Sequence, residues 1–498
     1  MVLDVQSGGL FAEYDVGAYW DEMFRGVGGD VRPECAQLLS AFSSWDEGEF
    51  ERHVERANAT FQQLGITFTV HGDSRGTERL IPFDPIPRVV SAAEWAIIER
   101  GVAQRVRALN CFLQDVYHQR NLLRDGIMPA SLVLGGPGYR RHMAGVDVPH
   151  DIYIHIAGID IVRDADGRLL VLEDNLRTPS GISYVLENRD VSTRIMPGLF
   201  HGSAVRPVHQ YPQLLLATLE HVAPHGQRHP SIVVLTPGTY NSAYFEHSYL
   251  ARRMGVPLVE GRDLTVREGR VYMRTTRGHE PVDVIYRRVD DDFLDPLAFR
   301  PNSALGVPGV FFAYRSGNVT IVNAVGTGIA DDKVIYRFVP DLIRYYLSEE
   351  PVLGQVETYI PIVPDDLSYI ERNVGDLVLK SAHESGGYGM LIGRQSTREE
   401  REQYLERVRA DPRSFLAQRT VSLSRAPCWV GGGPDEGSNA ATHAGIQGRH
   451  VDLRPFALYG AEISLVPGGL TRVALNPGSL VVNSSQGGGT KDTWVCEA

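Results

Sequence analysis

The sequence has few cysteines, and they form no recognisable pattern. Cys35, Cys111, Cys428 and Cys496 are the four, and no two of them stand in a CxxC or CxxH spacing. This excludes the common zinc and dithiol motifs. We interpret the four as buried or incidental thiols of a reducing compartment.

Long apolar runs and runs of positive charge are also missing. The first residues, MVLDVQSGGLF, lack a basic leader, and no apolar run reaches about 18 residues. We therefore expect a cytoplasmic protein without a membrane partner. The 49 lysines and arginines stand against 61 acids, a net charge of −12. An acidic chain repels phosphate backbones, so we expect no nucleic-acid partner.

What is present is an ordinary globular composition, with 43% hydrophobic and 22% charged residues in 498. This length predicts about two to four domains, and the alternation of strands and helices predicts an α/β fold. Four segments are expected. Residues 1–90 are mostly helical, 91–225 carry a long helix and a hairpin, 226–350 form a Rossmann-like βαβ domain, and 351–498 are a glycine-rich α/β region.

Several elements can be placed within these segments. Helices are predicted at Phe50–Leu64, Ser91–Leu123 and Tyr336–Leu347, from apolar residues at three- and four-residue spacing. The stretch Ile232–Val259 is typical of a βαβ unit.

A hairpin in Asp151–Gly181 carries the most chemical information. Asp166-Gly167 between two β-rich runs predicts a two-residue turn. In that register Asp160 lies directly opposite Glu173, and Asn175 shares their face. Two carboxylates side by side would repel each other without a cation, and Mg²⁺ prefers such oxygen ligands. The alternative is a solvent-exposed pair of acids at a sheet end.

A second cluster, Asp376–Gly393, places Lys380 at a strand end before the glycine-rich turn Ser385-Gly386-Gly387-Tyr388-Gly389. Glycines let backbone N–H groups approach phosphate oxygens closely. The cluster is not a Walker loop, since no Gly-Lys-Ser/Thr opens a helix. A glycine-rich hairpin alone is a weak signal.

Further polar residues follow predicted strands or precede helices. Gln418 ends the strand Phe415–Arg419, Arg454 lies in Arg449–Phe456, and Arg472 lies in a hairpin Ile463–Leu475 that turns at Gly468-Gly469. Surface ion pairs are the alternative for both arginines. Lys333 precedes a helix and is either a surface charge or a nucleotide contact. Arg287 and Arg288 end a strand, where a substrate carboxylate could be clamped, or have a structural role.

Taken together, these motifs resemble the ATP-grasp enzymes. There an Asp and an E-x-N motif bind Mg²⁺ at the ATP phosphates, which matches Asp160, Glu173 and Asn175. An Arg often stands two residues before that Asp, where this chain has Gly158. The resemblance implies ATP contacts from Lys333, Lys380, Ser385, Gly386, Gly387 and Gln418, adenine contacts from the backbone of 415–419, and phosphate contacts from Asn483.

The order of the motifs is reversed here, because the metal hairpin comes before the nucleotide-binding part. The sequence is therefore similar to the circularly permuted ATP-grasp family, type 2, and more distantly to glutathionylspermidine synthetase. This implies a carboxylate–amine ligase that acts through an acyl phosphate, with Arg287, Arg288, Arg454 and Arg472 as catalytic arginines. An ATP-grasp kinase and a non-catalytic ATP-binding scaffold are the alternatives. Expected partners are small-molecule or peptide substrates, an α-helical protein and a second copy of the chain.

Overall fold

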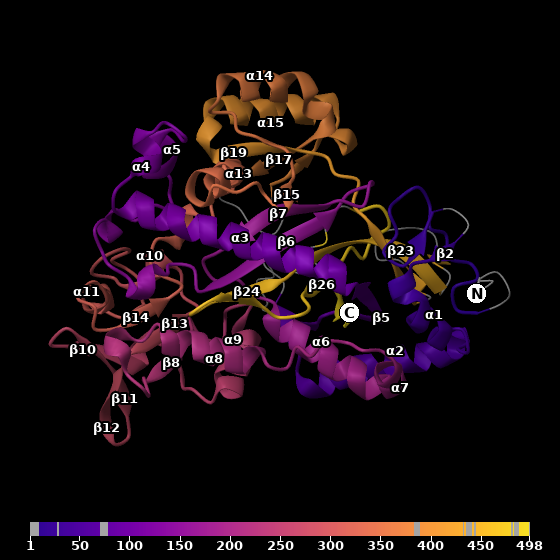
Figure 1. The fold of residues 1–498 in the computed structure, drawn as a ribbon, viewed down its shortest axis with the longest axis horizontal. Helices are drawn as coiled ribbons and strands as arrows, with labels where there is room; N and C mark the ends of the chain where they lie inside the picture. The colour runs from indigo at the N-terminus through magenta and orange to yellow at the C-terminus, as the bar shows by residue number, and fades with distance from the viewer. Residues whose placement is uncertain are drawn as a thin grey trace.

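The computed structural model describes residues 9–26, 29–69, 78–382, 389–431, 433–434, 441–442, 445–479, 482 and 488–497. Its centre is a ten-stranded sheet with the main order β15-β7-β6-β23-β26-β27-β5, to which β20, β24 and β25 are joined (Figure 1). The strands are β5 (Phe83–Val90), β6 (Ile156–Arg163), β7 (Leu169–Asn175), β15 (Gly354–Gln355), β20 (Arg425–Val430), β23 (Gly445–Arg454), β24 (Phe456–Tyr459), β25 (Ile463–Leu465), β26 (Leu470–Val473) and β27 (Gly489–Val495).

This sheet joins segments that are far apart in the chain. The hairpin β6–β7 pairs with β23 and β24, and β27 pairs in parallel with β5. The sheet thus takes strands from three of the four segments expected from the sequence. The four-domain division stays a prediction, but any division must keep these strands together.

The long helix α3 (Ala92–Tyr117) covers the central sheet (Figure 1). Ser91 caps its first turn, and the apolar residues predicted for its buried face lie in the main core: Trp95, Ile98, Val102, Val106, Leu109 and Phe112. The predicted end at Leu123 is wrong. The helix stops at Tyr117, Arg120 takes a left-handed φ of 57°, and a short α4 (Asn121–Arg124) follows.

A parallel four-stranded sheet, in the order β14-β13-β8-β9, forms the Rossmann-like part. Its strands are β8 (Ile232–Leu235), β9 (Leu258–Val259), β13 (Val284–Arg287) and β14 (Thr320–Val322), with α8 (Tyr211–His221) and α9 (Tyr244–Met254) beside them. The predicted βαβ unit is confirmed. A small antiparallel sheet, β10 (Leu264–Arg267), β11 (Arg270–Thr275) and β12 (Gly278–Val282), projects from this part (Figure 1).

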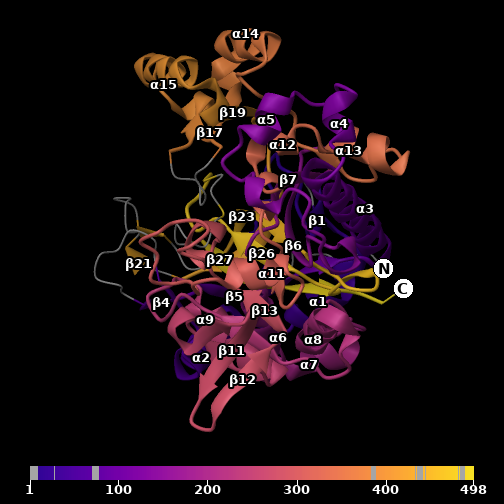
Figure 2. The same cartoon turned by 90° about the vertical axis from the view of Figure 1, so that its left-hand side faces the viewer.

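A separate lobe with its own apolar core stands above the central sheet (Figures 1 and 2). It contains β16 (Thr358–Tyr359), β17 (Leu377–Ser381), β18 (Leu391–Ile392) and β19 (Phe415–Arg419), covered by α14 (Pro364–Asn373) and α15 (Arg398–Ala410). We call this lobe the lid. The strand predicted at Phe415–Arg419 is confirmed by β19.

Two further expectations are corrected. No hairpin spans Ile463–Leu475, because β25 pairs with β24 while β26 pairs with β23 and β27. The helix predicted over Tyr336–Leu347 is broken into α12 (Lys333–Tyr336), α13 (Val339–Leu342) and a π-helical turn, Ile343–Leu347. Pro340 lacks an N–H and cannot continue a helix through Arg337.

The N-terminal part packs α1 (Ala36–Phe42) and α2 (Glu47–Leu64) against α6 (Ile182–Ile195) and α7 (Pro197–Gly202). The predicted helix Phe50–Leu64 lies within α2. Asp46 caps α2 by accepting a hydrogen bond from the Glu49 N–H, which places its start three residues earlier. Among the described residues, no helix combines the length and apolar character that crossing a bilayer requires.

Candidate active site

The hairpin β6–β7 brings the three predicted oxygen ligands together. Asp160 pairs directly with Glu173, and Gly158 with Asn175, as the sequence predicts. The predicted two-residue turn is wrong, however. The loop has three residues, closed by the Asp164 N–H donating to the Arg168 carbonyl at 3.0 Å, and Gly167 adopts a φ of 82°. A β-bulge between Asp160 and Ile161 offsets the longer loop and restores the predicted register.

Asp160 is buried and held by two arginines from the C-terminal strands. Nη2 of Arg454 and Nη2 of Arg472 donate to its Oδ2 at 2.9 Å and 2.7 Å. Burial would raise the pKa of Asp160, but the two guanidiniums outweigh it and hold that pKa well below its usual range. The side-chain N–H of Asn175 reaches Oδ1 at 3.4 Å. Residues from β6, β7, β23 and β26 thus meet at one point.

Arg454 also occupies the space above Gly158. A Cβ at position 158 would lie 3.1 Å from Pro179 Cβ and 3.2 Å from Arg454 Cδ. A larger side chain there would collide with the arginine stem. The stem of Arg454, from β23, therefore lies at the place where the resemblance predicts an arginine side chain.

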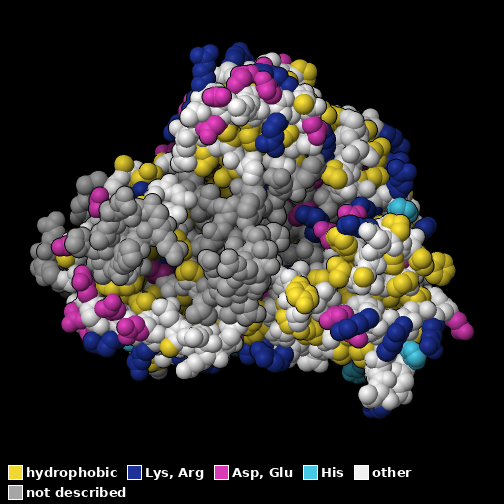
Figure 3. Space-filling view, turned by 180° about the vertical axis from the view of Figure 1, so that it is seen from behind, with side chains coloured by type: hydrophobic (Ala, Val, Ile, Leu, Met, Phe, Trp, Pro, Cys, Tyr) yellow, Lys and Arg dark blue, Asp and Glu magenta, His cyan; other side chains and the backbone are white. Residues whose placement is uncertain are grey.

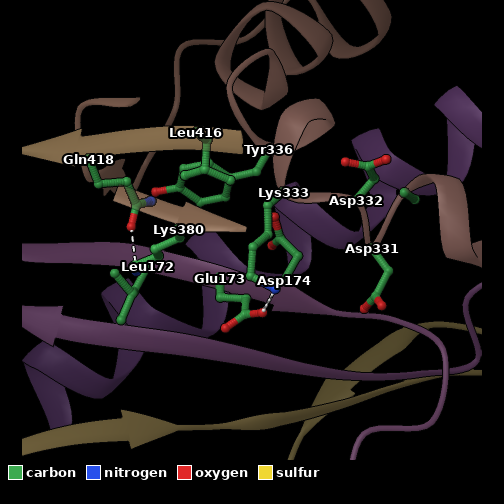
Figure 4. Close-up of a pocket in the computed structure, with 11 residues that line it drawn as sticks. Leu172, Glu173, Asp174, Asp331, Asp332, Lys333, Tyr336, Lys380, Leu416 and Gln418 are labelled. Atoms are coloured by element: carbon green, nitrogen blue, oxygen red, sulfur yellow. Dashed lines mark hydrogen bonds and ion pairs between the residues drawn. The ribbon is translucent and has the colours of Figure 1, made fainter. Parts of the chain in front are cut away.

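A small pocket between the hairpin and the lid contains two lysines (Figure 4). Lys380 donates to Gln418 Oε1 at 2.7 Å, and Lys333 forms an ion pair with Glu173 at 2.8 Å. Burial lowers the pKa of Lys380 to about 8, although the carboxylates of Glu173 and Asp160 oppose the shift. The remaining lining residues are Leu172, Asp174, Ala330, Asp331, Asp332, Tyr336 and Leu416.

Three parts of the chain build this pocket. β7 supplies Glu173, α12 begins at Lys333, and the lid strands β17 and β19 supply Lys380 and Gln418. Figure 2 shows α12 between β7 and the lid. The pocket thus brings two lysines, four carboxylates and apolar side chains together between two lobes, a common position for ligand sites.

The comparison with known proteins decides the family. Residues 87–474 match the family model described as circularly permuted ATP-grasp type 2. The chain belongs to this family.

Bacterial relatives share most of its length. It is 50% identical to an uncharacterized protein of Synechocystis sp. over 97% of this chain and 98% of that protein. It is 48% identical to an uncharacterized protein of Mycobacterium tuberculosis, over 96% and 84%. A Frankia alni protein with the provisional name glutamate–cysteine ligase 2-3 is 41% identical over 94% of this chain but only 53% of its own length.

A solved structure supports the fold. The glutathione synthetase-like effector of Globodera pallida, in its apo form, superposes with a TM-score of 0.56 over 91% of this chain and 98% of that chain, at 11% identity. The predicted α/β, circularly permuted ATP-grasp fold is confirmed. The family supports a ligase-type function that uses ATP and small-molecule substrates.

Other predicted site residues of this ATP-grasp protein are placed differently. Arg287 is fully buried and pairs with Asp291 at 2.8 Å, while Arg288 pairs with Glu246 at 3.1 Å. Arg287 also donates to three backbone carbonyls, and Arg288 to one. Their guanidiniums are used inside the protein, so the geometry does not support a substrate clamp at either residue.

The predicted adenine contacts stay a prediction. β19 pairs with β17 along its whole length but with the two-residue β16 only at Ala417 and Gln418. Leu416 and Gln418 line the pocket. Ser385, Gly386, Gly387 and Asn483 lie outside the described residues.

Two arginines beside the site were missed by the sequence reasoning. Arg177 follows the E-x-N motif by two residues and binds Asp331 and Asp290, and Arg140 binds Asp291 and Asp292. The closeness of Arg177 to Asn175 was a usable signal. No sequence signal marked Arg140, because it comes from a loop of the 91–225 segment with no motif around it.

Proposed function

We propose that this protein is an ATP-dependent carboxylate–amine ligase that forms an amide through an acyl phosphate. The observation that carries the proposal is that Glu173 lines an inter-lobe pocket with Lys333 and Lys380. Its hairpin partner Asp160 is held beside it by Arg454 and Arg472. Phosphoryl transfer needs positioning and charge neutralisation more than covalent help from the protein. These residues supply both.

The donor set fits Mg²⁺. Two carboxylates and an amide oxygen on one hairpin face match an ion that takes one or two carboxylates and completes its shell with phosphate oxygens and water. Bound there, Mg²⁺ would neutralise phosphate charge. Glu173 is now paired with Lys333, so we expect Lys333 to turn to a phosphate when Glu173 turns to the ion.

The reaction then has two steps. A carboxylate oxygen of the first substrate attacks the γ-phosphorus of ATP, and the bond to ADP breaks. The ammonium group of the second substrate first gives one proton to water. The resulting amine nitrogen attacks the carbonyl carbon of the acyl phosphate, the C–O bond to phosphate breaks, and the nitrogen loses one further proton to water. Lys380 would hold the phosphoryl oxygens in the first step. Arg454 and Arg472 now bind Asp160, so they would contact these oxygens after Asp160 turns to the ion.

The relatives support small amino-acid-like substrates, since one of them has the provisional name of a glutamate–cysteine ligase. This chain spans about half of that relative, so the name is only a guide to the class of substrate. The cytoplasmic location, the α-helical protein partner and self-association stay predictions.

Substitution of Glu173 tests the proposal. We expect Glu173→Gln to lower ADP formation by about a thousandfold or more, because a neutral amide binds Mg²⁺ poorly and leaves phosphate charge unneutralised. ADP release would be measured with pooled amino acids and dicarboxylic acids. Glu399→Gln, at an exposed acid in the first turn of α15, is the matched control. Near-normal turnover in Glu173→Gln would reject the metal site.

Hydroxylamine distinguishes the ligase from an ATP-grasp kinase. It attacks an acyl phosphate to give a hydroxamate, which a phosphorylated hydroxyl product does not give. Hydroxamate formation that requires ATP and a carboxylic acid is the expected result. ADP formation without hydroxamate would favour the kinase. A non-catalytic scaffold would bind Mg·ATP but form neither ADP nor hydroxamate in these assays.

A further inference from the structure

A second cavity, of about 200 Å³, adjoins the nucleotide pocket. Glu173, Asp331, Asp332 and Lys333 line both. The cavity lies beyond the carboxyl end of β13, the place where ligands of open parallel sheets bind. It has room for about seven water-sized groups, which is the size of an amino acid. Its other lining residues are Pro137, Gly138, Arg140, Asn175, Arg177, Asp290, Asp291, Asp292, Gly328 and Ala382.

The charges around this cavity leave one carboxylate in excess. Six carboxylates and three cations line it, and two further cations, Arg287 and Arg413, pair with Asp291 and Asp332 from behind. Asp290 and Asp292 are the most accessible acids, with 44% and 58% of their side chains exposed. In Figure 3, acidic and basic side chains gather in a hollow between the lid and the Rossmann-like part.

Two arginines beside these acids keep hydrogen-bonding capacity. Arg140 uses Nε on Asp291, at 3.3 Å, and Nη2 on Asp292, at 2.8 Å. Arg177 uses Nη1 on Asp290, at 3.1 Å, and Nε on Asp331. Nη1 of Arg140 and Nη2 of Arg177 have no hydrogen bond or ion pair with a described residue. The guanidiniums are thus held in place while each retains donors for a carboxylate.

We propose that this cavity binds the amine substrate of the ligase as an amino-acid zwitterion. Its ammonium group contacts Asp290 and Asp292, and its carboxylate contacts Arg140 and Arg177. The shared lining brings the amine next to the place where the acyl phosphate forms. The proposal rests on the proposed function for its role in catalysis, but the binding itself can be tested without turnover.

The test is calorimetric binding to the full chain with Mg²⁺ and a non-hydrolysable ATP analogue. The probes are the common L-amino acids, each compared with its carboxamide and its N-acetyl derivative. We expect at least one amino acid to bind, and both of its derivatives to bind about tenfold or more weakly, because each loses a charge-assisted hydrogen bond.

Two variants separate the two ends of the ligand. Arg140→Gln should weaken the binding of the amino acid, so that it binds no more tightly than its carboxamide. Asp292→Asn should make the amino acid bind no more tightly than its N-acetyl derivative. Asp290→Asn tests the second carboxylate at the ammonium end. The substitution should not disturb α10 (Asp291–Leu294), because asparagine can still cap that helix. Arg398→Gln and Asp365→Asn, at exposed positions of the lid helices α15 and α14, are the matched controls and should leave binding unchanged.

The proposal is overturned if none of the amino acids binds, if diamines bind as well as amino acids, or if the site variants bind like the controls. Its failure is distinct from that of the ligase proposal. Hydroxamate formation uses hydroxylamine in place of the amine, so it can persist when the cavity binds no amino acid. The amino-acid pattern can likewise hold in a protein that makes no hydroxamate.

Discussion

At the scale of single residues, Arg454 lies at the place where the resemblance predicts an arginine at position 158. The resemblance predicts an arginine two residues before Asp160, and the chain has glycine there. Arg454 lies over that glycine and reaches the same carboxylate. The sequence could not reveal the replacement, because Asp160 and Arg454 are 294 positions apart and meet only through the pairing of β6 with β23.

This arrangement predicts the behaviour of a double variant. Arg454→Ala should lower kcat by about a hundredfold, the usual effect of losing one group that stabilises transferring charge. Gly158→Arg alone should also be harmful, because its stem collides with that of Arg454. In the double variant, Gly158→Arg with Arg454→Ala, the collision with Arg454 is gone and only the 3.1 Å contact with Pro179 Cβ remains to be relieved, so we expect about a tenfold recovery in steady-state assays. A double variant no more active than Arg454→Ala would contradict the idea.

The fate of the other predicted residues follows from what residue type alone can indicate. Asp160 and Glu173 were found because two acids directly opposite in a hairpin need a cation or other positive charge. Arg287 and Arg288 were misjudged because a charged residue at a strand end can either bind a substrate or form a structural ion pair. Their burial and their partners Asp291 and Glu246 decide between them, and neither partner is evident before the fold is known.

At the scale of elements, the hairpin was predicted correctly for its pairing and incorrectly for its turn. The loop is one residue longer than expected, and the bulge adds one unpaired residue on β7. The two departures cancel, so Asp160 still faces Glu173. Bulges depend on packing beyond the strand itself, which explains why the local pattern showed the ligand face but not the bulge.

Asp174, the middle residue of the E-x-N motif, forms an ion pair that holds this hairpin against α3. Asp174 points away from the ligand face, and its two oxygens accept from Nε and Nη2 of Arg105 at 2.6 Å and 2.8 Å. Both side chains are buried. The ion pair therefore fixes β7 against the long helix, and through β7 it fixes the positions of Glu173 and Asn175.

Breaking this pair should therefore destabilise the protein. Arg105→Met leaves a buried carboxylate without its partner, and we expect a loss of about 3–5 kcal/mol in the free energy of unfolding. The double variant Arg105→Met with Asp174→Leu should recover much of that loss, because apolar pairs often replace buried ion pairs without cost. Urea denaturation would measure both. Equal stability of Arg105→Met and the parent would show that the pair does not fasten the hairpin.

At the scale of the whole molecule, the sequence indicated the permuted order of parts but not how they close on one another. The motifs predicted which segments belong to the site. The pairing of β27 with β5 and of β23 with β6 joins segments hundreds of residues apart, and strand patterns carry no information on such partners. The hairpin β6–β7 and the lid strand β19 were predicted singly, whereas their meeting at α12 was not.

Two buried histidines should make the stability of the folded protein depend on pH. His155 lies just before β6 and is buried, and its backbone N–H donates to Oδ1 of Asn323, which follows β14, at 2.8 Å. Burial lowers the pKa of His155 to about 3 and that of His247, in the Rossmann-like part, to about 2. The folded protein therefore keeps both rings neutral in the region where its two main sheets meet.

Acid should weaken the fold through these residues. Below the ordinary pKa of about 6.5 the unfolded chain binds protons that the folded chain excludes, so the stabilising contribution is complete above that pH and falls as pH drops toward 3. The expected slope is about 1.4 kcal/mol per pH unit for each histidine. Asp21 opposes it, since burial raises its pKa to about 6 and the folded form holds that proton.

His155→Leu isolates one contribution, because it removes a single titrating ring and leaves Asp21 and His247 unchanged. Urea denaturation between about pH 7.5 and about pH 5 should show a slope shallower by about one proton in the variant. The variant and the parent should differ least at the upper end of this range and diverge as the pH falls. Parallel stability curves across the range would mean that His155 becomes protonated without unfolding the contact between the two sheets.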